Sequence, residues 1–348
     1  MAIGRTLGHM NRVDVAIIGG GPAGAATAIF CAESGLSVAI IESASFPRDR
    51  PGESLHPGIE PLLKRLGVDG KIREANFVRH EGHWTKWDAD WCFVPFGADD
   101  TGPWRGFQAW RADFDAIMIQ RAAELGVQMY QPCRAIRPIV ERKRVSGLVT
   151  SEGELRSSWV VDAAGGHHWL ARKLGLPIKK YSPRLIVRYG YVTGQCPTRD
   201  HAPVMESDSR GWTWTAKVRP NVYQWTRLDL VQDCASEQVA IPKEYEGMSV
   251  LGRIKGVDVT WRKVKKPAGP GYWLVGDAAF ILDPASSHGV LKAIMSGMMT
   301  AHHITGIATG SFDEKTAFRA YQHWLGDWFH HDRDRLEEFY RLLPCYSN

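Results

Sequence analysis

The sequence has no C-x-x-C pair, no block of like charges, no internal repeat and no low-complexity segment. Its six cysteines are scattered, so they indicate neither a zinc site nor a dithiol centre. Scattered cysteines without a signal peptide favour reduced thiols and a cytoplasmic protein. The 43 basic and 38 acidic residues give a net charge of only +5. We therefore expect no nucleic-acid partner.

A long uninterrupted hydrophobic run is also missing. The segment from Val15 to Ala32 carries no charge, but glycines and a proline interrupt it. It therefore predicts a strand, a turn and a helix, and no membrane span. Residues 1–10 contain no apolar core, and their Gly-His-Met ending is typical of a cloning scar. We expect the native chain to begin at Met10.

The composition that is present is ordinary for a globular protein, except for an excess of tryptophan. The 348 residues predict about two domains with a sizeable core. The 44% hydrophobic and 23% charged residues exclude wholesale disorder and a small disulfide scaffold. Tryptophan occurs 14 times. We expect most of these rings in the core, and a group of them to form a pocket for a flat aromatic substrate.

The first glycine motif lies between two apolar segments. Val13–Ile18 and Leu36–Ile41 predict parallel strands of a βαβ unit, and the turn after the first strand fits G-x-G-x-x-G. In this motif the glycines permit a tight turn, the approach of a diphosphate and close helix–strand packing. An acid at the end of the second strand accepts hydrogen bonds from ribose hydroxyls. The candidate dinucleotide-binding residues of this unit are Gly19, Gly21, Pro22, Ala23, Gly24, Glu42 and Ser43.

Two further predicted strands end in aspartate and glycine. The candidate cofactor-binding residues there are Asp162, Ala163 and Gly165 in mid-chain, and Gly276, Asp277, Pro284, Gly289 and Val290 near the end. Taken alone, Asp277 is equally explained as an acid that caps a turn.

Together, the three segments closely resemble the FAD-binding set of single-component flavin monooxygenases and flavin-dependent halogenases. The resemblance implies bound FAD, with Asp277 at the ribityl chain and the helix after Pro284 facing the flavin. The loop Pro51–Ser54 resembles the P-G-E-S loop of halogenase-like and geranylgeranyl-reductase-like flavoproteins. It further implies that Arg48 and Arg111 lie near the cofactor phosphates, although a surface ion pair would also explain each of them.

A second set of motifs bears on the reaction. Gly211–Trp214 is similar to the start of the halogenase W-x-W-x-I-P motif, but Ala216 and Lys217 stand in place of Ile-Pro. Lys86 lies at an offset similar to that of the halogenase lysine that receives the hypohalous species, which makes it a candidate catalytic residue. The chain resembles more closely the short halogenase-like flavoproteins that mature quinone cofactors of bacterial amine and amino-acid oxidases. That resemblance implies hydroxylation of a peptidyl tryptophan.

Further candidate catalytic residues flank these motifs. His288 is a candidate general base and Lys292 lies one helical turn beyond it, whereas Glu53 is a candidate for orienting the substrate or accepting a proton. Their structural alternatives are a histidine that caps the turn and a glutamate that holds its loop. Three residues, His323, Asp327 and His331, share one helix face but cannot converge on an ion, so we predict no metal site.

Alternating aromatic and polar residues between 184 and 261 predict an antiparallel sheet. We expect one face to form an aromatic cage beside the flavin and the rest to be ordinary core. The candidate substrate-binding residues are Tyr189, Trp212, Trp214, Trp225 and His56.

The predicted fold class is α/β: a glutathione-reductase-type, Rossmann-like FAD-binding domain with an inserted antiparallel-sheet substrate domain and a C-terminal helix. The FAD-binding domain is expected to be discontinuous, over residues 11–75, 111–183 and 262–312. The substrate domain takes residues 76–110 and 184–261, and the helical segment residues 313–345.

The functional hypothesis is an FAD-dependent monooxygenase that hydroxylates tryptophan or another indole, in a peptide or protein, through a flavin C4a-hydroperoxide. O₂ is the expected co-substrate, and electrons arrive from transient NAD(P)H or from reduced flavin made by a separate reductase. One alternative is a flavin-dependent halogenase of tryptophan or a peptide. The others are a geranylgeranyl-reductase-like oxidoreductase and a non-catalytic assembly factor that contains FAD.

Overall fold

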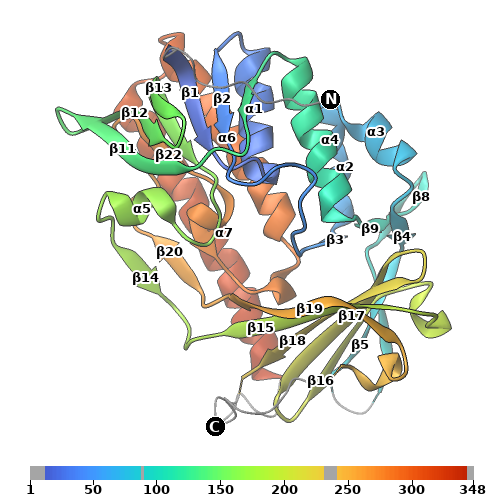
Figure 1. Cartoon of the computed structure of the whole chain (residues 1–348). Helices are drawn as coiled ribbons and strands as arrows, with labels where there is room; N and C mark the ends of the chain where they lie inside the picture. The colour runs from blue at the N-terminus through green and yellow to red at the C-terminus, as the bar shows by residue number, and fades with distance from the viewer. Residues whose placement is uncertain (1–11, 88–89, 231–240, 343–348) are drawn as a thin grey trace.

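The computed structural model describes residues 12–87, 90–230 and 241–342. The expected cloning scar and the start at Met10 lie outside the described residues, as does the end of the expected C-terminal segment. Within the described part, the chain forms an eight-stranded sheet, a seven-stranded sheet and a long helix that passes beside both (Figure 1). These elements confirm the predicted α/β class with an antiparallel sheet and a C-terminal helix.

Parallel strands form the centre of the eight-stranded sheet. Strand β1 (Arg12–Ile18) lies between β2 (Val38–Ile41) and β13 (Gly153–Asp162), and β13 also pairs with β22 (Tyr272–Leu274). All of these pairs are parallel, and β2 and β22 are buried throughout, as expected for strands covered on both faces. The carboxyl ends of these four strands therefore meet at one edge of the sheet.

The remaining strands extend this sheet on both sides. Strand β10 pairs with β2, β12 and β11 follow β13, and β21 pairs with β22. Their bounds are β10 (Gln128–Tyr130), β11 (Ala135–Glu141), β12 (Arg144–Thr150) and β21 (Ala268–Gly269).

Helix α1 (Pro22–Glu33) packs at backbone distance against its neighbours because its residues are small. A Cβ atom on Gly24 would lie 2.0 Å from the carbonyl oxygen of Gly19. A Cβ atom on Gly297, in helix α6 (Gly289–Ala308), would lie 2.5 Å from the carbonyl oxygen of Ala23. Neither position has room for a side chain, so α1 is held tightly between its own glycine turn and α6.

Helix α4 (Arg111–Glu124) also packs on α1, and helix α7 (Glu314–Arg341) begins with the N-cap Asp313, whose side chain accepts from Thr316 N–H. The other helices are α2 (Glu60–Arg65), α3 (Asp69–Glu74) and α5 (Trp169–Lys173). Small sheets are formed by β3 (Ser54–Leu55), β9 (Gly106–Gln108) and β4 (Val78–His80), by β14 (Ile178–Lys180), β20 (Arg262–Val264) and β23 (Phe280–Ile281), and by β7 (Ala98–Asp99) and β8 (Gly102–Pro103).

The seven-stranded sheet has the order β19-β15-β18-β17-β16-β5-β6, and each pair is antiparallel except β16 with β5. The bounds are β19 (Ser249–Asp258), β15 (Ile186–Thr193), β18 (Val222–Asp229), β17 (Gly211–Arg219), β16 (Val204–Asp208), β5 (Gly82–Lys86) and β6 (Cys92–Pro95). In Figure 1 this sheet lies below the eight-stranded sheet.

The register assigns each side chain to one of two faces, because neighbours directly across the strands share a face. Trp214 lies opposite Thr226, which lies opposite Tyr189, and Met205 lies opposite Trp214. We call the face that carries these residues the cleft face. Trp225 lies opposite Thr215 and therefore points the other way.

Each face has its own core. On the cleft face, Trp212 packs with Leu228, Trp261 and the α7 residues Leu336 and Tyr340. On the opposite face, a small core contains Val192, Cys196, Tyr223, Trp225 and Tyr245. The sheet is thus covered by the C-terminal helix on one side and by its own connections on the other.

Candidate flavin site

The glycine and aspartate motifs converge at the carboxyl edge of the parallel strands. Ile18, at the end of β1, lies directly opposite Ile41 of β2 and Asp162 of β13, and Asp162 lies opposite Leu274 of β22. In open α/β sheets, ligands bind in the crevice outside this edge. The three predicted cofactor segments therefore lie side by side in space, although more than 100 positions separate each from the next.

Glu42 is buried directly beside the first glycine turn. Its carboxylate accepts hydrogen bonds from Gly20 N–H, at 2.9 Å, and from Ala44 N–H, at 3.0 Å, and Ser43 Oγ lies 3.3 Å from it. A carboxylate has about four lone-pair sites. Glu42 can therefore hold the turn and still accept from a ribose hydroxyl.

Arg48 and Arg111 share one buried carboxylate, that of Asp115. The Nε and Nη2 atoms of Arg111 donate to Asp115 at 2.9 and 3.1 Å, and its Nη1 donates to the carbonyl of Pro51. Arg48 lies 3.4 Å from Asp115 and 3.6 Å from Glu42. The two guanidinium groups are thus positioned by carboxylates inside the protein, which excludes the surface-ion-pair explanation.

The glycine turn fits a diphosphate. A Cβ atom on Gly21 would meet a single neighbour within 4 Å, the Nη2 atom of Arg48 at 3.5 Å. The buried Nε of Arg48 has no hydrogen-bond partner among the described residues. Gly21 is also the N-cap of α1 and carries no side-chain cap. An anion at this point would meet a helix amino terminus and the Nη2 atom of Arg48.

Asp162 has a different role from a direct cofactor ligand. Its carboxylate, fully buried, accepts from Ala164 N–H at 2.9 Å and from Leu170 N–H at 2.7 Å. Burial raises the pKa of Asp162 to about 6. Ala163 N–H donates to the carbonyl of Ile18, and Gly165 has a φ of +77°, a conformation that favours glycine. This segment shapes the turn that packs on Gly19.

Asp277 projects from a short 3₁₀ turn, η4 (Gly276–Ala278), directly after β22. The side chain is 53% exposed, and its Oδ1 accepts from the buried Lys292 Nζ at 2.8 Å. Lys292 also donates to the carbonyl of Phe280 at 3.0 Å. Lys292 therefore orients Asp277, and the structure does not place its ammonium group free in the cleft as the catalytic prediction requires.

The last predicted cofactor residues lie between η5 (Pro284–Ser286) and the start of α6. Asp283 caps η5 by accepting from Ala285 N–H at 3.0 Å. Pro284 begins this turn, whereas Gly289 and Val290 begin α6 with His288 as N-cap. Among the described residues, a Cβ atom on Gly289 would meet nothing within 4 Å, so no described side chain covers the amino end of α6 at this point.

Glu53 links its own loop to the seven-stranded sheet. It is only 3% exposed, accepts from Gly52 N–H at 2.9 Å, and accepts from the hydroxyl of Tyr191 on β15. Burial raises the pKa of Glu53. Tyr191 also contacts the ring of Trp110 edge to face. Glu53 thus holds its own loop and fixes the position of the antiparallel sheet relative to the flavin crevice.

Two histidines approach each other at the mouth of this crevice. The rings of His56 and His288 are 6.2 Å apart, and His288 Nδ1 lies 3.0 Å from the carboxylate of Asp332 on α7. His56 also contacts Phe96, which contacts His83, which in turn contacts Trp214 on the cleft face. These half-buried rings form an aromatic wall, and burial lowers the pKa of both His56 and His83.

The structure separates the other predicted substrate residues. Trp214 belongs to the aromatic wall, and Tyr189, which contacts Tyr191, lies on the cleft face. Trp212 is on the same face, but it is fully buried and donates to Tyr340 Oη. Trp225 is buried in the core on the opposite face. We therefore retain Trp214 and Tyr189 as candidates and remove Trp212 and Trp225, because core packing accounts for them.

Lys86 does not reach the crevice. Lys86 lies directly across from Glu206, and Glu206 lies opposite Thr213. These three side chains therefore share the face of the sheet opposite to that of Trp214. The ammonium group of Lys86 is 3.3 Å from Glu206, and it lies over the ring of Trp91. The alternation along β5 therefore points Lys86 away from the flavin, which corrects its candidate role as the halogenase-type lysine.

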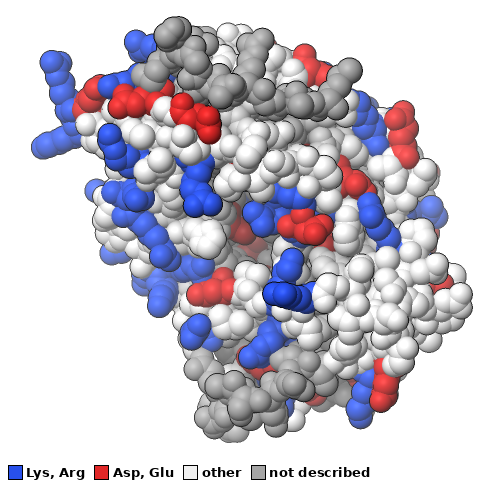
Figure 2. Space-filling view, viewed as in Figure 1, with Lys and Arg blue, Asp and Glu red and all other residues white. Residues whose placement is uncertain are grey.

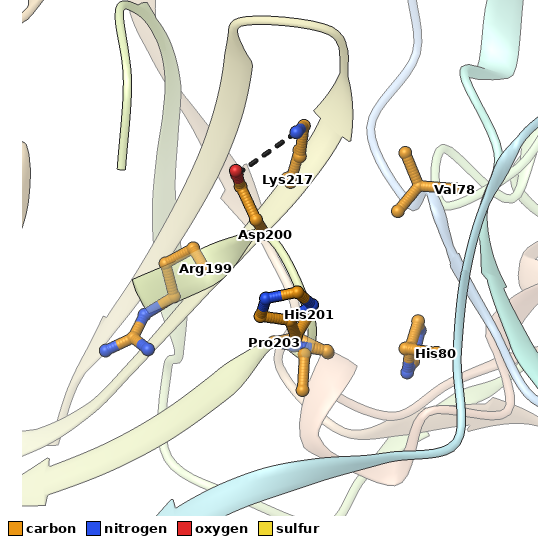
Figure 3. A pocket seen from close by; sticks show the side chains of 8 residues that line it. Val78, His80, Arg199, Asp200, His201, Pro203 and Lys217 are labelled. Carbon is orange, nitrogen blue, oxygen red and sulfur yellow. Dashed lines mark ion pairs between the residues drawn. The ribbon is translucent and has the colours of Figure 1, made fainter. Parts of the chain in front are cut away.

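The hollow near the middle of the face in Figure 2 has charged side chains around it. Two cavities among the described residues lie elsewhere. One of about 10 Å³, lined by His80, Asp200, His201 and Lys217, has room for a single water (Figure 3). A second, of about 280 Å³, lies at the amino end of β1 near Arg12 and Arg156. Neither cavity contains the residues of the flavin crevice.

Within residues 12–87, 90–230 and 241–342, no group of His, Cys, Asp or Glu side chains could hold a metal ion. In the same part of the chain, no helix combines the length and apolar character that crossing a membrane requires.

Five residues of the site were missed from the sequence: His83, Phe96, Asp115, Tyr191 and Asp332. His83 and Phe96 lie in an aromatic, irregular stretch that carries no motif. Asp115 had a usable signal, since it lies four positions after Arg111 on a predicted helix, the spacing at which side chains meet. Tyr191 was noted only as one of several alternating aromatic residues. Asp332 had no signal, because it lies among charged residues of a helix that also has a long exposed face.

Known proteins with similar sequences are named as halogenating enzymes. A brominase of 1H-pyrrole-2-carbonyl groups on a peptidyl-carrier protein, from Pseudoalteromonas luteoviolacea, is 27% identical over 353 residues, covering 91% of this chain and 83% of that protein. A tryptophan 2-halogenase from Chondromyces crocatus is 25% identical over 345 residues, covering 90% of this chain and 65% of that protein.

The fold is shared with a solved structure. The flavin-dependent brominase Bmp2 superposes with a TM-score of 0.82 at 24% identity, covering 97% of this chain and 89% of that one. A family described as an FAD binding domain matches residues 12–316. The predicted Rossmann-like fold and the FAD cofactor are thereby confirmed. With the three strand-end motifs, the arginine pair and this match in agreement, the chain belongs to the FAD binding domain family.

Proposed function

We propose that this protein is an FAD-dependent enzyme that halogenates an electron-rich aromatic substrate. The observation that carries the proposal is the position of an aromatic wall, His56, Phe96, His83 and Trp214, beside a crevice built for FAD. The halogenase relatives favour halogenation over the other reactions of this family. The substrate is a flat aromatic ring, free or carried on a peptide or protein.

The residues of this chain have distinct roles in the proposal. Arg48, Arg111 and the amides at the start of α1 hold the diphosphate, and Glu42 holds a ribose. Asp277, oriented by Lys292, accepts from hydroxyls of the ribityl chain. When bound and reduced by electrons from NAD(P)H or a separate flavin reductase, FAD supplies the activation of O₂.

On the substrate side, the aromatic wall stacks against the ring and restricts the access of water. Glu53 and Tyr191 keep this wall at a fixed distance from the crevice. The side chains therefore position and shield the substrate, while the oxidising power comes from the cofactor.

Hydroxylation is the second candidate, and the position of Lys86 favours it. A halogenase of the expected type needs a lysine between flavin and substrate, and Lys86 faces away. In a hydroxylase this lysine is unnecessary. The further proposal, that the substrate is a peptidyl tryptophan in quinone-cofactor maturation, rests on motif resemblance alone, because the similar proteins described above are named as halogenases.

The test is a product analysis with one variable, the halide. Protein loaded with FAD is reduced in the presence of O₂ and given tryptophan, a tryptophan-containing peptide or a pyrrole, with bromide or without halide. Halogenation gives a product with the bromine isotope pattern only when bromide is present. Hydroxylation gives the mass of one added oxygen atom under both conditions. Failure to bind FAD would refute both candidates, and turnover without O₂ would support a reductase instead.

A further inference from the structure

The two histidines at the mouth of the crevice have opposite hydrogen-bonding character. The carboxylate of Asp332 accepts from Trp328 Nε1 at 2.9 Å, and its only other close partner in the described chain is His288 Nδ1 at 3.0 Å. A carboxylate can only accept, so Nδ1 of His288 carries a proton. The lone pair of a neutral His288 is therefore on Nε2.

His56 has the reverse arrangement. Gly58 N–H donates to His56 Nδ1 at 3.0 Å, so the lone pair is on Nδ1 and the proton of the neutral ring is on Nε2. Burial, with a smaller contribution from His288, lowers the pKa of His56 and so favours its neutral form. Within the part of the chain that the structure describes, one ring thus has an acceptor without a partner and the other a donor without a partner, with ring centres 6.2 Å apart and planes at 80°.

Asp332 is unusual among the acids of α7. It is 4% exposed, whereas Asp327, one turn earlier, pairs with His323 at 3.2 Å with both side chains largely exposed. In the described residues, no lysine or arginine forms an ion pair with Asp332. A buried carboxylate costs several kcal/mol unless it is compensated. The His288 ring and the Trp328 indole N–H are its compensation, so the geometry of His288 is fixed from α7.

We propose that His288 is the base that removes a proton from the substrate ring, and that Asp332 is a positioning residue that holds His288 in the Nδ1–H tautomer. This inference rests on the proposed function. After an electrophile has bonded to a ring carbon, that carbon still carries its hydrogen. Nε2 of His288 takes this proton, and the C–H electron pair returns to the ring and restores its aromaticity. The Nε2–H group of His56, on the neighbouring ring, is a donor for a polar atom of the substrate.

The groups facing His288 come from three elements. Asp332 lies on α7, His56 precedes the short turn η1 (Pro57–Ile59), and Lys292 lies one turn further along α6 with its ammonium group engaged by Asp277. Lys292 is therefore unable to replace His288 as the proton acceptor without losing its bond to Asp277.

The first experiment measures the tautomer without any reaction. Histidine side chains are labelled with ¹³C and ¹⁵N in the FAD-loaded protein, and His288→Gln assigns the resonance. We expect the Nδ1–H tautomer in the wild type and a mixed population in Asp332→Asn, because an asparagine amide can donate to Nδ1 as well as accept from it. Asp327→Asn is the matched control and should leave the resonance unchanged. An Nε2–H tautomer in the wild type would overturn the inference.

The second experiment measures turnover. His288→Ala should lower kcat by roughly 10²–10⁴-fold while FAD affinity stays near that of the wild type. Because the buried Asp332 loses a partner, the melting temperature should fall as well, so turnover is measured well below it. Added imidazole should restore part of this loss, and Asp332→Asn should show a smaller loss. Full activity of His288→Ala overturns the base assignment but leaves the proposed function intact. A wild type without any product overturns the proposed function, and the base assignment with it.

Discussion

The buried bond between Glu53 and Tyr191 gives a sharp prediction about stability and pH. Tyr191→Phe removes the hydroxyl that donates to Glu53 but keeps the ring that contacts Trp110. A hydrogen bond to a charged group contributes about 1.5–3 kcal/mol, compared with about 1 kcal/mol for a neutral one. We therefore expect the variant to lose about 2 kcal/mol of unfolding free energy where Glu53 is ionised.

The pH dependence follows from the direction of the pKa shift. Burial raises the pKa of Glu53 in the folded protein above its ordinary value of 4.5. The folded protein therefore binds the Glu53 proton more tightly than the unfolded chain, and this contribution to stability is lost as pH rises through the folded pKa. Removing the Tyr191 donor raises the folded pKa further. Each additional unit of the folded pKa lowers the unfolding free energy by about 1.4 kcal/mol at pH values above that pKa, where Glu53 is ionised. At pH values below the ordinary pKa of 4.5, where Glu53 is protonated in both states, it has no effect.

The assay is urea unfolding of the FAD-free protein at several pH values. The difference between wild type and Tyr191→Phe should be about 2 kcal/mol near pH 8 and fall by about 1 kcal/mol or more towards pH 4. Tyr189→Phe is the matched control on the same strand and should show no such pH dependence. A difference that stays constant over the whole pH range would refute the assignment of the carboxylate as acceptor.

Three further predictions concern the crevice. Gly21→Ala should leave the unfolding free energy of the FAD-free protein nearly unchanged, because among the described residues its Cβ meets only Arg48 Nη2, at 3.5 Å, but it should weaken FAD binding at least ~10-fold by blocking the diphosphate. Gly24→Ala, with its Cβ 2.0 Å from a carbonyl oxygen, should lower both the unfolding free energy and the FAD affinity. Equal effects of the two changes would contradict this. Asp115→Asn removes the negative charge that pairs with the buried guanidinium groups of Arg48 and Arg111, and should lower the unfolding free energy of the FAD-free protein by about 3–5 kcal/mol in urea titrations. An unchanged unfolding midpoint would count against the shared-carboxylate arrangement. Lys86→Ala should keep full turnover in the product assay, and a loss of product with normal FAD binding would restore the lysine as a catalytic residue.

The fold and the cofactor end of the site were largely predictable because their signals are local. A glycine turn after an apolar strand constrains its own backbone, and Gly19, Gly21 and Gly24 are needed wherever a diphosphate approaches a helix end. The same holds for Glu42, which follows its strand directly. Parallel strands then bring separate turns to one edge without any further information.

The substrate side could not be predicted in the same way because it depends on register between distant strands. Whether Lys86 faces the flavin is decided by its pairing with Glu206, 120 positions away, and a shift by one residue would reverse the answer. Trp214 and Trp225 have similar sequence surroundings, but opposite faces of the sheet separate them. Asp332 is buried where η5 and α6 pack on α7 and where its carboxylate meets His288, a contact between residues 44 positions apart.

The close contact between α1 and α6 sets the distance between the two ends of the cofactor site. Helix α1 begins at the first glycine turn, whereas α6 begins directly after its N-cap His288, and the two helices meet where Gly297 lies against the Ala23 carbonyl. The spacing between the nucleotide end and the reacting end is therefore set by one rigid crossing of backbones, and the loops need not maintain it. Gly297→Ala, remote from every reacting atom, would push α1 and α6 apart. It would then misalign the flavin ring with the substrate, although every residue of the binding motifs would be unchanged.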